Sequence, residues 1–433
     1  MSPDSSDTSA RRHLWHPWKP WVVSPDELTL VRGAGYRVWD DRGGSYIDAT
    51  SSSLNATCGY GHPSIVGAAT RQLSVLHHFD LSVATHRPAG LLAERIADLL
   101  PSPLRRTLFV NSGSEAVEAA LFVAASYHQL RGDPRTRIVT LDRGYHGSTL
   151  LARTVSGLPT TAHPLRDPLP VTRVGLPVEP RRLREPEALA PFVAAVERAL
   201  TADHPGGAPM AVLMEPFLNV GGGIVLPRGA LRAVRELCDR TGALLVLDEV
   251  FTGFGRTGRM FARDEEDVLP DLLLTSKGLA GGYLPIGAVT ARQEVYELFA
   301  ADPMLGGLRH GHTTSGHAVA CAAALATLDL LEREKLVERA AELGQVMLDG
   351  LAGLAGHGRI LDVRGVGMVT VLETDSMAAA TELVGRLRAA GLLLRQQGAV
   401  AMAVPPLIID EEGVSAIVGT ILEQAADGLE VSR

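Results

Sequence analysis

One lysine stands where an apolar run ends and glycines begin, in Asp271-Leu-Leu-Leu-Thr-Ser-Lys-Gly-Leu-Ala-Gly-Gly-Tyr283. The chain contains 41 Lys and Arg residues, yet only Lys19, Lys277 and Lys335 are lysines. Lys277 alone follows a stretch typical of a buried strand, where desolvation lowers the pKa of an amine and makes it a better nucleophile toward an aldehyde. Lys277 is therefore a candidate for covalent attachment of a cofactor. The alternative is a strand-end lysine that reaches solvent.

Two acids end another apolar run, in Leu244-Leu-Val-Leu-Asp-Glu-Val250. A carboxylate at the end of a buried strand is costly unless it meets a cation. A protonated pyridine nitrogen would provide that cation for Asp248. The competing interpretation is an acidic metal site that includes His310, His312 or His317. Further ligands at suitable spacing are missing, so no metal is predicted.

The segment Asn111-Ser-Gly-Ser-Glu-Ala-Val-Glu118 follows a predicted strand and opens a helix. The helix dipole favours an anion here, and Gly113 and Ser114 could offer N–H groups and a hydroxyl to a phosphate. Ser112 and Glu115 also match a capping box, which needs no ligand. Both interpretations remain open at this point.

Two further loops complete this set of groups. Arg309-His-Gly-His-Thr-Thr-Ser-Gly316 contains Thr313 and Thr314, precedes a predicted helix and also suits a phosphate. Tyr145, in Arg143-Gly-Tyr-His-Gly147, could lie flat against a planar ring or be a partly buried turn residue. A lysine for an aldehyde, an aspartate for a ring nitrogen, a stacking aromatic and phosphate-binding turns together describe pyridoxal phosphate.

The elements that must position these groups alternate along the chain. Apolar strands are predicted at Thr107–Val110, Ile138–Leu141, Ala211–Glu215, Leu244–Asp248, Leu272–Thr275 and Ile286–Thr290. Helical spacing occurs at Ile65–Val75, at Pro88–Leu100 and between the later strands. Apolar strands that alternate with helices predict an α/β fold with a mostly parallel, doubly wound sheet, which binds ligands at the strand C-termini. We expect Pro159–Pro186 to be a surface loop.

The two ends of the chain differ from this pattern. Residues 1–12 are predicted to be disordered, and the tryptophan-rich segment His13–Trp21 to dock on the protein's own core or on a partner. A small strand meander is predicted at Leu28–Asp48, and a smaller α+β unit after Gly316. The predicted domains are 13–64 and 321–433, which form the two parts of a small domain, and 65–320, a large cofactor-binding domain.

Bulk composition narrows the class of protein. A net charge of -8, a pI near 6.0 and arginines interspersed with acids disfavour a nucleic-acid-binding surface. Cys58, Cys238 and Cys321 fit neither a disulfide framework nor a metal-ligand spacing. The N-terminus has no apolar signal segment, and no uninterrupted apolar run reaches about 18 residues. We therefore expect a cytoplasmic protein that acts on small molecules, with no membrane or nucleic-acid partner.

The motifs stand in the order typical of a known family. They are Asn-Ser-Gly-Ser-Glu at 111, Gly-Tyr-His-Gly at 144, Met-Glu-Pro at 214, Leu-Asp-Glu-Val-Phe-Thr-Gly-Phe-Gly-Arg-Thr-Gly at 247, Ser-Lys-Gly-Leu at 276 and His-Thr-Thr-Ser-Gly at 312. In this order they resemble the class-III pyridoxal-phosphate-dependent aminotransferases, from about His13 to Glu423. The resemblance implies the fold-type I architecture and a homodimer whose active sites are shared between the subunits.

The resemblance also implies roles for matching residues. Lys277 would bond to the aldehyde carbon of the cofactor, and Asp248 would keep the ring nitrogen protonated. Val250 would pack under the ring opposite Tyr145, and Thr313 would reach the phosphate of the neighbouring subunit's cofactor. The predicted cofactor-binding set is Ser112, Gly113, Ser114, Tyr145, His146, Glu215, Asp248, Val250, Lys277, Thr313 and Thr314. In a ping-pong mechanism, a donor amine would displace Lys277, whose freed amine would carry a proton between substrate and cofactor carbons.

Residues outside the cofactor motifs bear on the identity of the substrate. The segment His13-Leu-Trp-His-Pro-Trp18 resembles the N-terminal motif of the diaminopelargonate synthases of biotin synthesis, in which a tyrosine replaces Trp18. A related His-Pro motif occurs in the ω-amino acid:pyruvate group. The biotin enzymes carry paired tryptophans where this chain has Ser53 and Leu54. So large a change of pocket volume and shape argues against the same substrate.

Arg395 stands where both of those groups place a substrate-binding arginine, which can bind a carboxylate with two hydrogen bonds or swing aside. Met402 replaces the arginine that the ornithine, acetylornithine and 4-aminobutyrate aminotransferases pair with the equivalent of Glu215.

We therefore predict an ω- or amine-type aminotransferase that acts on an aldehyde, ketone or keto acid. The arginine-rich composition resembles that of actinobacterial proteins, where such enzymes often serve secondary metabolism. The alternatives are the biotin-pathway enzyme, an aminomutase or racemase, and a non-catalytic protein of this fold. The predicted substrate-binding residues are Trp18, Ser53, Leu54, Tyr145 and Arg395.

Overall fold

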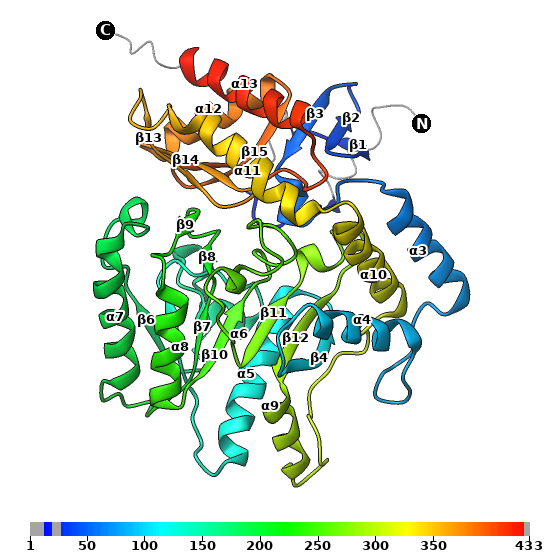
Figure 1. Ribbon diagram of the computed structural model, residues 1–433, viewed down its shortest axis with the longest axis vertical. Coiled ribbons are helices and arrows are strands. Elements are labelled where there is room, and N and C mark those ends of the chain that lie inside the picture. Colours follow the sequence, from blue (N-terminus) through cyan, green and yellow to red (C-terminus); the bar gives the residue numbers. More distant parts are fainter. Residues whose placement is uncertain (1–12, 20–26, 166, 428–433) are drawn as a thin grey trace.

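The computed structural model describes residues 13–19, 27–165 and 167–427 of the 433-residue chain. The predicted disorder of residues 1–12, and Trp21 of the tryptophan-rich segment, lie outside the described residues. The chain builds two seven-stranded sheets, and the strands from both chain ends lie together in one layer above the central sheet (Figure 1).

The larger unit is built on a sheet with the strand order β4-β12-β11-β10-β7-β5-β6. Neighbouring strands are parallel except at β12, which is antiparallel to both β11 and β4. The predicted α/β class and mostly parallel sheet are confirmed. The strands are β4 (Leu104–Val110), β5 (Arg137–Leu141), β6 (Val171–Val174), β7 (Pro209–Met214), β10 (Leu244–Asp248), β11 (Leu272–Thr275) and β12 (Gly287–Arg292).

Apolar side chains cover both faces of this sheet. In β10, Leu245 and Leu247 belong to one apolar cluster, whereas Leu244 and Val246 belong to another, because successive side chains point to opposite faces. Strands β5, β7, β10 and β11 are buried along their whole length, in accord with their mainly apolar sequences. The helices of this unit are α3 (Pro63–Val75), α4 (Arg87–Asp98), α5 (Gly113–Leu130), α6 (Leu150–Val155), α7 (Leu189–Thr201), α8 (Ala230–Thr241), α9 (Gln293–Leu298) and α10 (Ala318–Arg333).

The second sheet combines the N-terminal meander with C-terminal strands, in the order β1-β2-β3-β15-β16-β14-β13. The two ends of the chain meet where β3 pairs with β15 in parallel. The strands are β1 (Leu30–Ala34), β2 (Arg37–Asp40), β3 (Ser45–Ala49), β13 (Ile360–Gly365), β14 (Thr370–Thr374), β15 (Leu392–Gln397) and β16 (Val400–Ala403). Three helices lie along this sheet: α11 (Leu336–Ala352), α12 (Met377–Ala389) and α13 (Glu411–Asp427) (Figure 1).

Short elements connect these layers. Helix α2 is a kinked turn at Ser51–Leu54, and β8 (Phe217–Leu218) pairs with β9 (Ile224–Val225) in a small ribbon. The 3-10 helices are Pro159–Thr161, Pro180–Arg182, Pro186–Ala188, Ala262–Glu265, Lys277–Leu279 and Phe299–Ala301.

Strands β6 and β15 are not predicted from the sequence. The prediction of a loop over Pro159–Pro186 is wrong, because Val171–Val174 forms β6 at the edge of the central sheet. An edge strand needs only one partner, and four residues flanked by prolines give little periodic signal. Strand β15 has no clear strand pattern in the sequence, because the polar residues at its end interrupt the apolar run.

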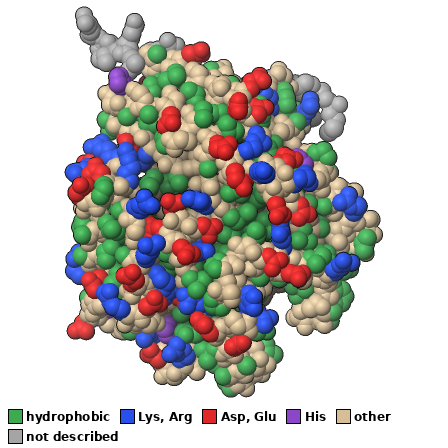
Figure 2. All heavy atoms as spheres, viewed as in Figure 1, with side chains coloured by type: hydrophobic (Ala, Val, Ile, Leu, Met, Phe, Trp, Pro, Cys, Tyr) green, Lys and Arg blue, Asp and Glu red, His purple; other side chains and the backbone are tan. Residues whose placement is uncertain are grey.

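Figure 2 shows acidic and basic side chains interspersed on the face of the molecule that is viewed, over both units. This distribution agrees with the mixed charge pattern of the sequence. Within the described ranges, no helix combines the length and apolar character needed to cross a lipid bilayer.

Two glycines let the unit built on the second sheet approach the loop that follows Asp248. Gly344 lies within α11, where an added Cβ would overlap the carbonyl oxygen of Gly367. Gly367 has a φ of +50°, and an added Cβ there would overlap the backbone of Thr257 and Gly258. The positions of α11, the Gly367 turn and the loop therefore depend on each other.

We expect Gly344→Ala to lower the free energy of unfolding by about 1–3 kcal/mol, because the new methyl group must displace the Gly367 backbone. Gly385→Ala is the matched control, since Gly385 lies in α12 with no atom within 4 Å of an added Cβ. It should raise stability by up to about 1 kcal/mol, as alanine is the better helix former. Urea denaturation measures both changes, and equal effects of the same sign would contradict this packing.

Candidate active site

Four neighbouring strands, β11, β10, β7 and β5, end at the same edge of the central sheet, and the residues there surround a cavity. Asp248 ends β10, Lys277 follows β11, Glu215 follows β7 and Tyr145 lies in the loop after β5. The cavity encloses about 590 Å³ of space between its lining residues, part of which is open to solvent. It is lined by Gly113, Ser114, Tyr145, His146, Gly147, Glu215, Asn219, Val220, Asp248, Val250, Phe251, Ser276 and Lys277.

Lys277 turns into this cavity from the end of β11. Its φ of +24° lies in a region that residues with a side chain rarely adopt. Its amine lies 5.6 Å from the centre of the Phe251 ring. Burial lowers the pKa of Lys277 to about 8, although the carboxylates of Asp248 and Glu215 oppose the shift. An appreciable fraction of the amine is therefore neutral and nucleophilic near neutral pH, unlike that of a solvated lysine.

Asp248 is fixed by hydrogen bonds to both carboxylate oxygens. Only 4% of the residue is exposed. Its Oδ2 lies 2.8 Å from Nδ1 of the buried His146, and its Oδ1 accepts a hydrogen bond from the N–H of Val250 at 3.1 Å. His146 is held in turn by Thr140, whose Oγ1 lies 3.3 Å from Nε2, and by Ser156, whose Oγ accepts from the His146 N–H at 2.9 Å. The direction of the carboxylate is thus set before a ligand binds.

Glu215 is a second buried carboxyl group of the cavity. Burial raises its pKa to about 7. It accepts hydrogen bonds from the N–H of Tyr145 at 2.8 Å and from the N–H of Asn219 at 3.4 Å. Met402, which replaces the arginine of related families, is buried in an apolar cluster and offers no charge. Backbone N–H groups therefore satisfy Glu215 where a guanidinium would otherwise do so.

The turn at the start of α5 is closely packed against two other segments. A Cβ added to Gly113 would lie 2.8 Å from Val250, and one added to Gly147 would overlap the Ser114 hydroxyl. Ser114 Oγ accepts a hydrogen bond from the N–H of Ser148 at 3.0 Å. The first N–H groups of this 18-residue helix lack partners within the helix, and the small residues let an anion come close to them.

The capping-box alternative at this turn is only half formed. Ser112 Oγ accepts a hydrogen bond from the N–H of Glu115 at 3.2 Å, but the Glu115 carboxylate binds the N–H of Asn111 at 2.6 Å. Thr314 Oγ1 donates to the side chain of Asn111 at 2.8 Å. Thr313 and Thr314 are both exposed, and neither lines the cavity of its own chain.

The predicted substrate-binding residues are less closely gathered. The ring of Trp18 meets Tyr145 edge-on at 6.4 Å between centroids, and 61% of Trp18 is exposed. Leu54 is buried in an apolar cluster that includes Phe251, whereas Ser53 beside it is exposed. None of Trp18, Ser53 and Leu54 lines the cavity, which therefore holds the predicted cofactor residues rather than the whole predicted substrate set.

Arg395 comes from the second sheet, where it pairs with Met402 across β15 and β16. Burial lowers the pKa of its guanidinium, and Tyr145 opposes this shift. Arg395 also helps to lower the pKa of Lys277. Its Nε is buried without a hydrogen-bond partner among the described residues. Arg395 thus does not line the cavity, but it lies close enough to the Lys277 amine to lower its pKa.

The histidines considered as metal ligands have other contacts. His310 stacks on Phe122 with centroids 5.3 Å apart, and His317 stacks on His78 at 5.4 Å. In the part of the chain that the structure describes, no three His, Cys, Asp or Glu side chains are grouped so that they could hold a metal ion.

Sequence reasoning did not assign site roles to five lining residues, namely Gly147, Asn219, Val220, Phe251 and Ser276. Gly147, Phe251 and Ser276 belong to or adjoin the recognised motifs, so reading those motifs in full would have found them. Asn219 and Val220 lie in a loop whose return to the cavity has no periodic signal in the sequence.

A family model, aminotransferase class-III, matches residues 22–425. The chain belongs to the class-III aminotransferases. The ω-aminotransferase of Caulobacter vibrioides is 34% identical over 425 residues, covering 94% of this chain and 96% of that protein. The adenosylmethionine-8-amino-7-oxononanoate aminotransferase of Nitratidesulfovibrio vulgaris is 36% identical over 454 residues, covering 96% of this chain and 82% of that protein.

Solved transaminase structures share the architecture of this class-III aminotransferase. The ω-transaminase from Pseudomonas jessenii in complex with PMP has a TM-score of 0.92 and 30% identity, covering 98% of both chains. An aminotransferase of Bacillus anthracis has a TM-score of 0.93 and 29% identity, covering 99% of this chain and 100% of that chain. The predicted fold-type I architecture is therefore confirmed.

Class-III aminotransferases use pyridoxal phosphate, and the residues of the cavity fit this cofactor. Lys277 offers an amine with a pKa of about 8 to an aldehyde, and Asp248 offers an oriented carboxylate to a ring nitrogen. Gly113 and Ser114, which line the cavity at the N-terminus of α5, offer N–H groups to a phosphate. The prediction of a pyridoxal-phosphate-dependent aminotransferase is confirmed.

We expect covalent capture of pyridoxal phosphate by Lys277 to follow the lowered pKa of its amine. Labelling of the apoprotein, trapped with borohydride, should rise through about pH 8 and then level off, because the neutral amine is the nucleophile. Mass spectrometry of the peptides separates Lys277 from the exposed Lys335, which is the internal control. The assignment fails if both lysines are labelled with the same dependence on pH.

Proposed function

We propose that this enzyme is an ω- or amine-type aminotransferase that moves an amino group from a donor amine to an aldehyde, ketone or keto acid. The observation that carries this proposal is the pairing of Arg395 with Met402 beside the lysine cavity. Arg395 supplies one guanidinium whose Nε has no partner among the described residues. The apolar Met402 occupies the position where related families have a second arginine. Arg395 can therefore bind one carboxylate or swing aside for a neutral substrate.

In this proposal the residues of the chain bind the cofactor and move one proton. When bound, pyridoxal phosphate accepts electrons from the substrate carbon. Asp248, fixed by His146, holds the proton at the ring nitrogen. Tyr145 and Val250, which both line the cavity, would hold the ring between them. The amine of Lys277 would act as the general base and acid that moves the proton during amino transfer.

The phosphate in this proposal is bound by Ser112, Gly113 and Ser114, and by Thr313 of a second copy of the chain. The exposure of Thr313 and Thr314 outside their own cavity supports a homodimer with shared active sites. We further propose that the enzyme works in the cytoplasm, and that residues 65–320 form a cofactor domain flanked by a small domain from both chain ends.

A second candidate function is the aminotransferase step of biotin synthesis. It is favoured by the 36% identity to the adenosylmethionine-8-amino-7-oxononanoate aminotransferase of N. vulgaris. Ser53 and Leu54 argue against it, since Leu54 is buried among apolar side chains rather than presenting an indole to a substrate. An aminomutase would use the same residues without a second substrate.

A panel of amino donors separates these functions. We expect neutral amines and small amino acids to discharge the visible absorbance of the bound cofactor, because Arg395 can bind a carboxylate or swing aside. Discharge by S-adenosylmethionine alone would establish the biotin-pathway function and contradict the proposal. Product formed from a single substrate, without an acceptor, would identify an aminomutase.

Arg395→Ala should lower kcat/KM about 10- to 100-fold for donors that carry a carboxylate and spare neutral amines, because hydrogen bonds to charged groups contribute about 1.5–3 kcal/mol. Gln396→Ala is the matched control, since the Gln396 side chain binds Thr381 Oγ1 of α12 at 2.8 Å instead. Comparison of kcat/KM for a paired acid and amine measures the effect. An equal loss for both donors refutes the role of Arg395.

A further inference from the structure

Asn219 carries a buried amide that nothing else in the described chain satisfies. The residue is 1% exposed and lines the cavity that contains Lys277. Neither its Oδ1 nor its Nδ2 has a hydrogen-bond partner among the described residues. An unpaired buried amide is costly, and native structures keep such groups mainly where a ligand or water completes them.

The turn that carries Asn219 is held in place without help from its side chain. The Asn219 carbonyl oxygen accepts hydrogen bonds from the N–H groups of Gly222 at 3.2 Å and Gly223 at 3.0 Å. Its N–H donates to Glu215 at 3.4 Å. The buried Arg364 donates to the carbonyl oxygens of Gly222 and Gly223 at 2.6 and 2.7 Å. The backbone is therefore fixed, and the side-chain amide is left for a ligand.

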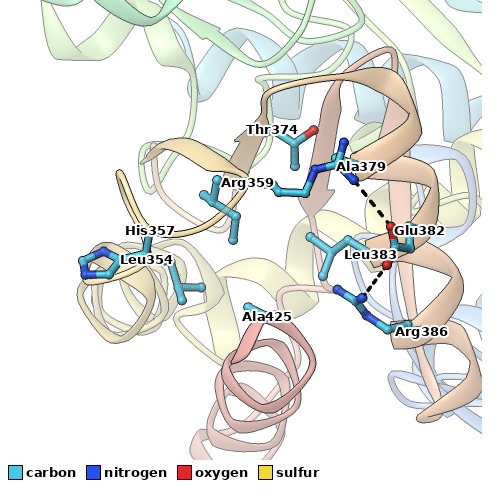
Figure 3. Close-up of a pocket in the computed structure, with 10 residues that line it drawn as sticks. Leu354, His357, Arg359, Thr374, Ala379, Glu382, Leu383, Arg386 and Ala425 are labelled. Atoms are coloured by element: carbon cyan, nitrogen blue, oxygen red, sulfur yellow. Dashed lines mark hydrogen bonds and ion pairs between the residues drawn. The ribbon is translucent and has the colours of Figure 1, made fainter. Parts of the chain in front are cut away.

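A cavity in the second unit shows the opposite arrangement (Figure 3). There Glu382 of α12 binds Arg386 at 2.7 Å and lies 3.5 Å from Arg359. Glu382 thus bridges two arginines there, although Nε of Arg386 has no hydrogen-bond partner among the described residues. That cavity therefore offers mutually bonded charged groups, whereas Asn219 offers an amide whose Oδ1 and Nδ2 both lack a partner among the described residues.

Chemical elimination then identifies the partner of Asn219. Lys277 serves the aldehyde of pyridoxal phosphate, Asp248 the ring nitrogen and the turn at Ser114 the phosphate, which leaves the ring hydroxyl. The neighbouring Ser276 hydroxyl is already used, because it donates to the carbonyl oxygen of Ile286 at 2.7 Å.

We propose that the side-chain N–H of Asn219 donates a hydrogen bond to the ring hydroxyl oxygen of bound pyridoxal phosphate. This assignment rests on the cofactor roles proposed above for Lys277 and Asp248. It adds a cofactor-binding residue that no motif in the sequence identifies.

The test compares the binding of two ligands by two forms of the protein. Apoprotein and its Asn219→Leu variant are titrated with pyridoxal phosphate and with 3-deoxypyridoxal phosphate, which lacks the ring hydroxyl. We expect Asn219→Leu to weaken binding of pyridoxal phosphate about tenfold, or about 1.4 kcal/mol, and binding of the deoxy analogue less than about twofold. Equal weakening of both ligands, or of neither, overturns the proposal.

Thr370→Val is the control, because Thr370 has an equally buried, unpartnered hydroxyl on β14 and does not line this cavity. It should leave both dissociation constants unchanged. Thermal unfolding of the apoproteins detects damaged packing: Asn219→Leu should unfold no earlier than the unchanged protein, since it removes an unpaired polar group. A failed comparison together with intact amino transfer would reject the role of Asn219 alone and leave the proposed function standing.

Discussion

Three ionisable groups are kept from water at the ends of adjacent parallel strands, and the rest of the site depends on how they are accommodated. An isolated charge in the protein interior costs several kcal/mol. Asp248 meets this cost by accepting hydrogen bonds from the N–H of Val250 and from Nδ1 of His146. Glu215 meets it through backbone N–H groups and a pKa raised to about 7, and Lys277 through a pKa lowered to about 8. The same desolvation that is costly for folding makes Lys277 a nucleophile.

The second sheet is joined to these strand ends by buried arginines. Burial lowers the pKa of Arg256 to about 10, and its guanidinium donates to the carbonyl oxygen of Pro405 at 2.7 Å. Arg364 holds the glycine turn beyond Asn219 by two further carbonyl oxygens. Because Arg395 lies on the same sheet as Arg364, these contacts also fix the distance between the proposed substrate arginine and Lys277.

The sequence contains enough information for the central sheet and the chemical groups at its edge. Strands buried on both faces have unbroken apolar sequences, so β10 and β11 are predicted with correct bounds, and Asp248 and Lys277 follow from them. The edge strand β6 and the half-polar β15 are not recovered, because tertiary pairing rather than local pattern makes them strands. Site residues in irregular turns cannot be predicted from the sequence for the same reason. The Asn219 amide becomes notable only when the structure shows that it is buried and unpaired.

The visible absorption spectrum of purified Lys277→Ala protein, incubated with pyridoxal phosphate and freed of unbound ligand, tests the central assignment most directly. If Lys277 bonds to the cofactor, the unchanged protein and a Lys335→Ala control keep a visible band, and Lys277→Ala does not. A persistent band of the same intensity in Lys277→Ala would show that another group holds the cofactor and would contradict the account.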